Sequence, residues 1–354
     1  MSVRHPVLAS AAAFGAAVLV TTLTAGSVKA QSMGFTPAAT IPGPVDLVRA
    51  EGTFAYLTRG MKLTIFDLSD PAAPVRRGEH AFPEEIWGFH VAGALAYVAA
   101  GHSGLWILDV SDPDTPRPRG SIATPGQAKN VAVSGGHAVV ADHMSGVDII
   151  DISDVDAPVE VGSVYTDGYA RDVAMFGSRA YAVDHPAGFY VLDMTAPDPL
   201  EAVGSLQSAS APRHVEILDG APHVAVLVGG VPFDPLRALR DDAPSVDPRG
   251  TLQIYDVSAP SAPTLITTFR TPGDAHRAEL RDHLAYVADG PAGLSVVDLS
   301  TPEAPRVVGS YATPRTVRDV AVGDGIVLLI DGTIHRRSHT YEDGDVVVLS
   351  QVAQ

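Results

Sequence analysis

The sequence contains no cysteine among its 354 residues. This absence excludes a disulfide framework, a thiol nucleophile and a cysteine-ligated zinc site. Basic residues are also scarce, since 24 Lys and Arg stand against 41 Asp and Glu and give a formal net charge of −17. Nucleic acids and anionic membranes bind basic surfaces, so this charge balance argues against both as partners.

Short catalytic signatures are absent as well. The sequence has no HExxH pair, no twelve-residue EF-hand loop, no Walker loop and no Rossmann glycine set. Nucleotide chemistry is therefore disfavoured, and no diagnostic spacing of metal ligands is present. The repeating part of the chain also carries no long apolar stripe at helical spacing, so strands are the expected elements.

Residues 1–30 have the layout of a secretory signal peptide. Arg4 belongs to a short basic start, residues 7–23 form an apolar run, and Val28 and Ala30 place small residues at positions −3 and −1 of a cleavage site. An uncleaved membrane anchor is the alternative interpretation. We expect cleavage after Ala30, no membrane span in the mature chain, and a secreted or periplasmic protein.

A motif of nine residues recurs along the rest of the chain. Its clearest copy, residues 146–154, reads Gly-Val-Asp-Ile-Ile-Asp-Ile-Ser-Asp. A fixed period made of short strand-like pieces indicates a repeat architecture. The aspartate after the apolar run, which we call the marker aspartate, is expected to brace a turn and not to catalyse. The marker aspartates are Asp67, Asp109, Asp151, Asp193, Asp256 and Asp298, with separations of 42, 42, 42, 63 and 42 residues.

Each period resolves into four short strands. In the third period the apolar and β-branched residues predict strands at 130–134, 137–141, 147–152 and 159–165. Four antiparallel strands in a period of this length are typical of a β-propeller blade. The sequence therefore predicts one all-β domain over residues 31–354.

The seventh period lacks its fourth strand. It has strands at 317–322, 326–330 and 345–350, whereas residues 35–41 precede the first period and have no other partner. An open ring exposes strand edges, and a strand donated by the N-terminal segment removes them. We predict a seven-bladed β-propeller of four-stranded antiparallel blades, closed by the N-terminal strand pairing with the last blade.

The period is interrupted by two insertions, near residues 229–250 and 333–344. Both fall between the second and third strands of their blades, and insertions in repeat proteins tend to lie on the binding face. The polar residues that they carry are Asp234, Arg237, Arg240, Asp241, Asp242 and Asp247 in the first, and His335, Arg336, Arg337, His339, Tyr341 and Glu342 in the second.

The repeated motif resembles that of the LVIVD-repeat family of extracytoplasmic proteins. Residues 296–300 (Val-Val-Asp-Leu-Ser) and 149–153 (Ile-Ile-Asp-Ile-Ser) carry the resemblance best, and a proline and a glycine follow the motif. The resemblance covers nearly all of the mature chain and implies a β-propeller at the cell surface or outside the cell. It implies no single reaction. Residues 154–155 and 194–196 depart from the pattern, and the seventh period lacks the marker aspartate.

Residues that open the first strand of each period form a set rich in cations. An arginine fork suits carboxylate, sulfate or phosphate, so an anion-binding ring is one interpretation. In the other, each arginine pairs with an aspartate, as the neighbours Arg171 and Asp172 or Arg318 and Asp319 invite, and only braces the repeat. The predicted ligand-binding residues are Trp87, Lys129, Arg171, Arg213, His214, His276, Arg277 and Arg318.

A second set follows the second strands, where Asp142, Asp184, Asp289 and Asp331 are expected to cap their turns. His143 and His185 come next in adjacent periods, where other periods have glycine. With His214 they are candidate ligands for a divalent metal, either a transition metal or calcium, or candidates for proton transfer.

A buried carboxylate requires a partner. Glu216 and Glu279 occupy a first-strand column that holds alanine in three periods. We expect local ion pairs, with His214 for Glu216 and Arg277 for Glu279.

The favoured function is a monomeric exported binding module for a small-molecule, glycan or protein ligand. The alternative is an enzyme at the channel mouth: a lyase or hydrolase acting on an anionic substrate such as an acidic polysaccharide, or a metal-dependent enzyme. Its candidate catalytic residues are His143, His185 and Tyr169, beside the arginines that would neutralise a carboxylate.

Overall fold

The structure is a computed structural model. It describes residues 33–185, 188–195, 202–206, 212–218, 224–229, 250–332 and 344–351. The predicted signal peptide and the charged residues of both insertions lie outside these ranges. No helix in the described ranges is long and apolar enough to cross a membrane.

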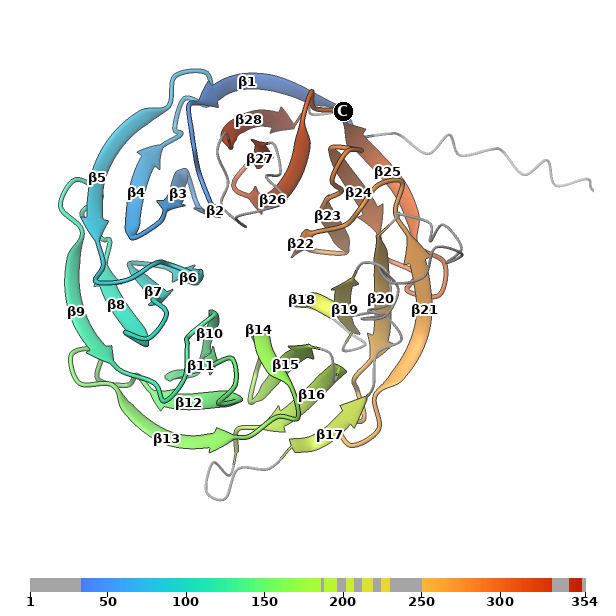
Figure 1. The fold of residues 1–354 in the computed structure, drawn as a ribbon. Helices are drawn as coiled ribbons and strands as arrows, with labels where there is room; N and C mark the ends of the chain where they lie inside the picture. Colours follow the sequence, from blue (N-terminus) through green and yellow to red (C-terminus); the bar gives the residue numbers. More distant parts are fainter. Residues whose placement is uncertain are drawn as a thin grey trace, which may run out of the picture. The chain divides into compact units, whose positions relative to one another are not determined.

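Seven four-stranded antiparallel sheets form the described domain, and they surround a central axis as the blades of a propeller (Figure 1). The first four blades contain β2 (Leu47–Glu51), β3 (Phe54–Arg59), β4 (Lys62–Asp67) and β5 (Val75–Ala81); β6 (Gly88–Ala92), β7 (Leu95–Ala99), β8 (Leu105–Asp109) and β9 (Arg117–Ile122); β10 (Asn130–Ser134), β11 (His137–Ala141), β12 (Val147–Asp151) and β13 (Val159–Val164); and β14 (Tyr169–Phe176), β15 (Arg179–His185), β16 (Gly188–Asp193) and β17 (Ala202–Leu206).

The remaining blades follow the same order, with the first strand of each innermost. They contain β18 (Pro212–Leu218), β19 (Val224–Gly229), β20 (Thr251–Asp256) and β21 (Thr264–Arg270); β22 (Arg277–Arg281), β23 (Leu284–Ala288), β24 (Leu294–Asp298) and β25 (Arg306–Tyr311); and β26 (Thr316–Val322), β27 (Ile326–Gly332) and β28 (Asp345–Gln351), with β1 (Phe35–Ile41) as the outer strand.

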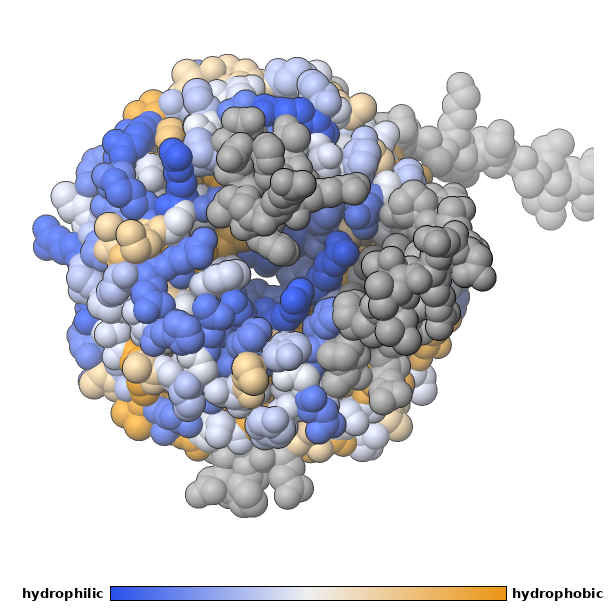
Figure 2. All heavy atoms as spheres, in the orientation of Figure 1, coloured by the Kyte–Doolittle hydropathy of each residue, from blue (hydrophilic) through white to orange (hydrophobic). Residues whose placement is uncertain are grey.

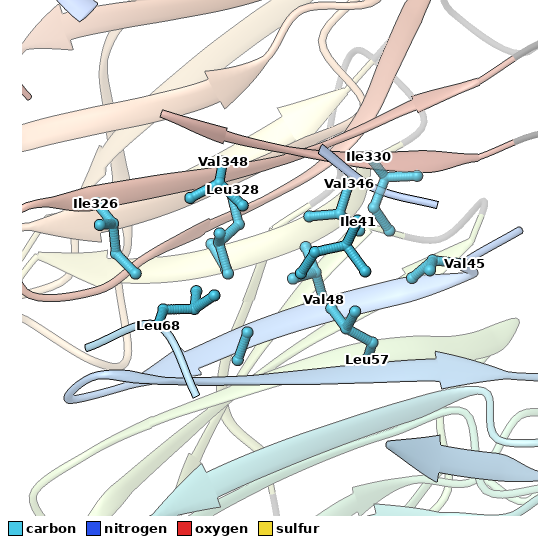
Figure 3. Packing of buried hydrophobic residues seen from close by; sticks show 12 residues of the cluster. Ile41, Val45, Val48, Leu57, Leu68, Ile326, Leu328, Ile330, Val346 and Val348 are labelled. Carbon is cyan, nitrogen blue, oxygen red and sulfur yellow. The ribbon is translucent and has the colours of Figure 1, made fainter. Parts of the chain in front are cut away.

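The predicted fold is confirmed, blade count and closure included. In the third blade the predicted and observed strand ends differ by at most one residue. β1 pairs antiparallel with β28, from Phe35 opposite Gln351 to Ile41 opposite Val346. Ile41 is buried with Val346 and Ile330 in the apolar layer between the last and first blades (Figure 3). The N-terminal strand therefore both pairs the exposed edge and contributes to the core.

The marker aspartates brace turns, as predicted. The Asp151 carboxylate accepts a hydrogen bond from the Ser153 N–H at 2.8 Å, and each of the other five accepts the N–H two residues ahead. This is the Asx-turn geometry, which replaces a backbone turn with a side-chain acceptor. The most conspicuous residues of the motif are therefore structural.

The second aspartate column has a different role from the one expected. Asp142 and Asp289 do not cap the turns that follow them. The Asp142 carboxylate accepts the Gly126 N–H at 2.5 Å, and that of Asp289 accepts the Gly273 N–H at 3.0 Å. Each acceptor is fully buried and ties the loop that enters its blade to the end of the second strand. Period spacing alone does not reveal this, because the partners lie 16 residues apart and meet only when the blade folds.

Candidate functional site

The inner strands begin at one end of the ring, beside the ends of the second strands. The Lys129 N–H donates to the Ala141 carbonyl at 2.7 Å, and the His276 N–H donates to the Ala288 carbonyl at 2.9 Å. We call this end the channel mouth. Hydrophilic residues surround the central opening of the ring in Figure 2.

Below the mouth, Asp172 joins three blades. Its carboxylate accepts hydrogen bonds from the Asn130 amide, the His214 imidazole and, at 2.8 Å, the Val215 N–H. Asp172 and His214 are each only 3% exposed. Burial by itself raises the pKa of Asp172, but His214 and Arg277 more than offset it and hold that pKa below its usual value. Asp172 is therefore an ionised brace between blades.

Asp319 is a second brace, which joins the sixth, seventh and first blades. It lies 3.3 Å from the Arg277 Nε and 3.2 Å from the Arg49 Nη1, and it accepts the Val48 N–H at 3.0 Å. The alternative pairing of Arg171 with Asp172 is not found among the described residues. The two aspartates instead bind side chains contributed by neighbouring blades.

Two predicted ligand-binding residues thus belong to the buried braces. His214 contacts Asp172 through Nδ1, while its Nε2 lies 2.8 Å from the Ala278 carbonyl oxygen and 3.1 Å from a Glu216 oxygen. Arg277 has a side chain that is 20% exposed and pairs with Asp319. The predicted pairing of Glu216 with His214 is confirmed, and it leaves neither nitrogen of His214 free.

Other cations remain at the channel mouth. Arg171 is exposed, and neither Arg171 nor Lys129 forms an ion pair within the part of the chain that the structure describes. Burial and the charge of Arg213 lower the pKa of Arg171. Arg213 Nη1 lies 4.0 Å and His276 Nε2 lies 3.8 Å from the Asp274 carboxylate. Arg318, in β26, also interacts with another group of the chain.

The Lys129 ammonium lies 3.3 Å from the centroid of the Trp87 ring, a cation–π contact. Partial burial and the positive charge of Arg171 lower the pKa of Lys129 to about 8, against the opposing charge of Glu85. Trp87 keeps 43% of its surface exposed. An indole and two cations therefore lie on consecutive blades at the mouth.

The three candidate catalytic residues lie close together. The His143 and Tyr169 rings stack with centroids 4.9 Å apart, and Tyr169 pairs with His185 in the ladder of the fourth blade. Burial lowers the pKa of both histidines, and nearby cations lower it further, so both are neutral at pH 7. Their participation in catalysis stays a prediction.

His143 also has an unusual backbone. Its φ is 55°, in the left-handed region that favours glycine, and the corresponding positions of other blades hold Gly101 at 54° and Gly290 at 56°. A non-glycine residue kept at such a position is a hint of function.

The three histidines do not assemble as metal ligands. Both ring nitrogens of His214 are engaged in the buried brace. Within the described ranges, no three His, Asp or Glu side chains are grouped so as to hold a metal ion. The donor set in this part of the chain therefore does not fit a His143–His185–His214 centre.

Sequence reasoning identified Glu216 and Glu279 in a second layer of the channel, two residues further along the inner strands than the buried braces, but missed Arg49 in the same layer. Burial and the neighbouring Glu216 raise the pKa of Glu279 to about 8. Its carboxyl accepts the Val322 N–H at 3.1 Å instead of pairing with Arg277 as predicted. Arg49 has a buried Nη2 without a hydrogen-bond partner. Aligning the first blade on the same column as Glu279 would have revealed Arg49.

The family model described as LVIVD repeat matches six segments, which together cover more than half of the chain: residues 42–80, 86–124, 125–166, 167–207, 246–271 and 272–313. The seventh blade is outside these matches. A search of curated proteins returns no match.

Solved structures share the fold at low sequence identity. The β-propeller domain of Myceliophteria thermophila Cps50 (Swd1) aligns with a TM-score of 0.64 at 12% identity, over 90% of this chain and 99% of that one. A chain of a mitotic checkpoint complex gives 0.62 at 11% identity, over 96% and 100%. The computationally designed protein Ika8 gives 0.61 at 9% identity, over 89% and 99%. These likenesses concern the fold alone.

Proposed function

This chain belongs to the LVIVD repeat family, and we propose that it is an exported β-propeller that binds an anionic ligand at the channel mouth. The observation that carries the proposal is the pair Arg171 and Lys129, cations without an ion pair in the described part of a chain whose net charge is −17. Lys129 is partly buried and lies near the positive charge of Arg171, and an anionic ligand would offset the cost of holding these two charges together.

Export rests on the first thirty residues. Their basic start, apolar run and small residues before position 31 match a signal peptide. The absence of cysteine means that no disulfide has to form during export. Expression in a bacterial host, followed by mass spectrometry of the periplasmic fraction, is expected to find a chain that begins at Gln31. A cytoplasmic, uncleaved chain would contradict export.

The ligand proposal is tested by calorimetry on the mature chain with citrate and inorganic phosphate as probes. Arg171→Gln and Lys129→Gln are each expected to weaken binding by at least about fivefold, or about 1 kcal/mol, a loss that only a minority of contact residues cause. Arg117→Gln, which removes an exposed charge from the outer strand β9, is the matched control and should leave binding unchanged. Equal affinity in all four proteins would refute the proposal.

A second candidate function, acid–base catalysis, is favoured by one observation: His143, His185 and Tyr169 lie together beside Arg171. A lyase acting on a uronate polymer would use a neutral base to remove the proton next to the carboxylate, and the glycosidic oxygen would leave as the double bond forms. Unsaturated sugar products that disappear in the His143→Ala, His185→Ala double variant would establish it. A chain that binds the polymer without cleaving it is a binding module.

A further inference from the structure

Exposed apolar side chains gather at the channel mouth, on the second to fourth blades. Trp87 precedes β6, Met144 lies in the turn after β11, Tyr165 follows β13, and Tyr169 is the first residue of β14. These four are 43%, 63%, 76% and 41% exposed. Large apolar side chains that cluster in this way mark an interaction surface.

Two of these rings are held in place on one face. Lys129 covers one side of Trp87, and His143 stacks on Tyr169. Rigid aromatic rings present large contact areas at little cost in conformational entropy. Trp87 and Tyr169 therefore form preorganised flat surfaces.

The cations are interleaved with these rings. Following the ring of blades, the mouth presents Trp87, then Lys129, then Tyr169 with Arg171, then Arg213. Each blade from the third to the fifth supplies one cation at the same position of the period, so the positive charges follow one another from blade to blade. Neighbouring charges act on each other, since Arg171 lowers the pKa of Lys129 and Arg213 lowers that of Arg171. An extended polyanion could offer one anionic group to each blade.

Acidic groups also face these cations. Glu85 acts on Lys129, Asp142 on His143, and Asp184 on His185. Asp142 and Asp184 are fully buried and accept hydrogen bonds from the entry loops, so they do not compete with an anionic ligand for the surface cations. Asp274 lies within 4.0 Å of Arg213, which places the least compensated charges on Lys129 and Arg171.

We propose that the ligand is an acidic polysaccharide, lying across the second to fifth blades with sugar rings on Trp87 and Tyr169 and its anionic groups at Lys129 and Arg171. A sugar ring has an apolar face that packs on an aromatic ring, and a uronate or sulfate group offers oxygens to a guanidinium fork. The inference rests on the proposed function and adds the polymer and the aromatic contacts to it. His143 acts here as a positioning residue for Tyr169.

The test compares four probes by calorimetry with the mature chain: polygalacturonate, its methyl-esterified neutral form, dextran sulfate and citrate. We expect polygalacturonate or dextran sulfate to bind, and the neutral polymer not to bind. Trp87→Ala and Tyr169→Ala should each weaken binding of the acidic polymer by about tenfold and leave citrate binding within about twofold. Val307→Ala, which truncates an exposed apolar side chain on the outer strand β25, is the control and should change neither.

The outcomes separate the two proposals. Citrate binding that depends on Arg171, with no polymer bound, would overturn the polysaccharide inference and leave the anion site standing. Unchanged affinity for the acidic polymer in Trp87→Ala and Tyr169→Ala would also overturn it, because charge alone would then account for the affinity. Binding of the neutral polymer with full affinity would contradict both proposals. Whether the uronate or the sulfate polymer binds decides which anionic group the channel mouth accepts.

Discussion

At the scale of single residues, adjacent positions in an inner strand have opposite roles. Arg171 is exposed and forms no ion pair among the described residues, whereas Asp172 is buried and joins three blades. The sequence does not show which of the two side chains is exposed and which is buried. Whether a side chain points to solvent or toward the neighbouring blade depends on packing between positions 42 residues apart.

This division predicts unequal costs of substitution. Asp172→Ala leaves Asn130, His214 and the Val215 N–H without their acceptor in a buried site, and should lower the free energy of unfolding by about 3–5 kcal/mol. Arg171→Ala should change it by less than about 0.5 kcal/mol. Denaturant unfolding of both variants measures the difference. Equal destabilisation would mean that Arg171 is also a brace.

The left-handed backbone at His143 predicts that replacing this residue affects the stability of the fold and ligand binding in opposite directions. His143→Gly relieves the positive φ and should leave the free energy of unfolding unchanged or raise it by up to about 1 kcal/mol, while weakening ligand binding through the loss of the Tyr169 stack. Asp282→Gly relieves the same strain in a turn at φ 55° and serves as the control, with binding unaffected. A large loss of stability in His143→Gly would assign His143 a structural role.

The partly buried carboxyl of Glu279 predicts a pH dependence of stability. Its folded pKa of about 8 lies above the unfolded value of 4.5, so between these values the folded state binds more protons than the unfolded state. Stability should therefore fall as pH rises through this window, by about 1–3 kcal/mol between pH 5 and pH 8.

Glu279→Gln keeps an oxygen acceptor for the Val322 N–H but cannot ionise, so its melting temperature should fall less over the same interval. The exposed Glu303→Gln is the control and should follow the wild-type curve. Parallel curves for the Glu279 variant and the wild type would show that Glu279 ionises normally in the folded chain.

At the scale of elements, the strands were predictable and their contacts across blades were not. Period, turn residues and β-branched runs locate β10 and β11 to the residue, because strand and turn propensities are local. The closing strand β1 was predictable by counting strands, since the seventh period lacked its fourth strand and residues 35–41 belonged to no period. The N–H groups that donate to the Asp142 column depend on how each blade folds, and the partners of Asp319 depend on how blades pack; local patterns encode neither.

Closure by β1 predicts a specific effect of truncation. Removal of residues 32–41 exposes the edge of β28 and uncovers the apolar layer around Ile41, so the melting temperature should fall by several degrees, about what the loss of 1–2 kcal/mol produces. Removal of residues 1–31 is the control and should leave melting unchanged. Identical melting of the two truncated chains would refute the role of β1 in closure.

At the scale of the whole molecule, residues that recur from period to period stabilise the ring, whereas residues that differ between periods form the candidate site. Six marker aspartates brace the equivalent turn in six of the seven blades, whereas Trp87, Lys129 and His143 each occupy a position that other blades fill differently. Two members of the predicted cation set, His214 and Arg277, turned out to be internal. Surface cations and buried cations occupy adjacent positions at the start of the inner strands, and only the structure shows which side chains face the neighbouring blade.

The central claim, that the channel mouth holds an anionic ligand, is tested most directly by chemical footprinting of the mature chain. Phenylglyoxal and acetylation label arginine and lysine side chains, and mass spectrometry reads the extent at each position with and without polygalacturonate or citrate. The account predicts protection of Arg171 and Lys129 by the ligand and unchanged labelling of Arg117 on the outer strand. Uniform labelling of all three, under conditions in which calorimetry detects binding, would place the ligand elsewhere and contradict the account.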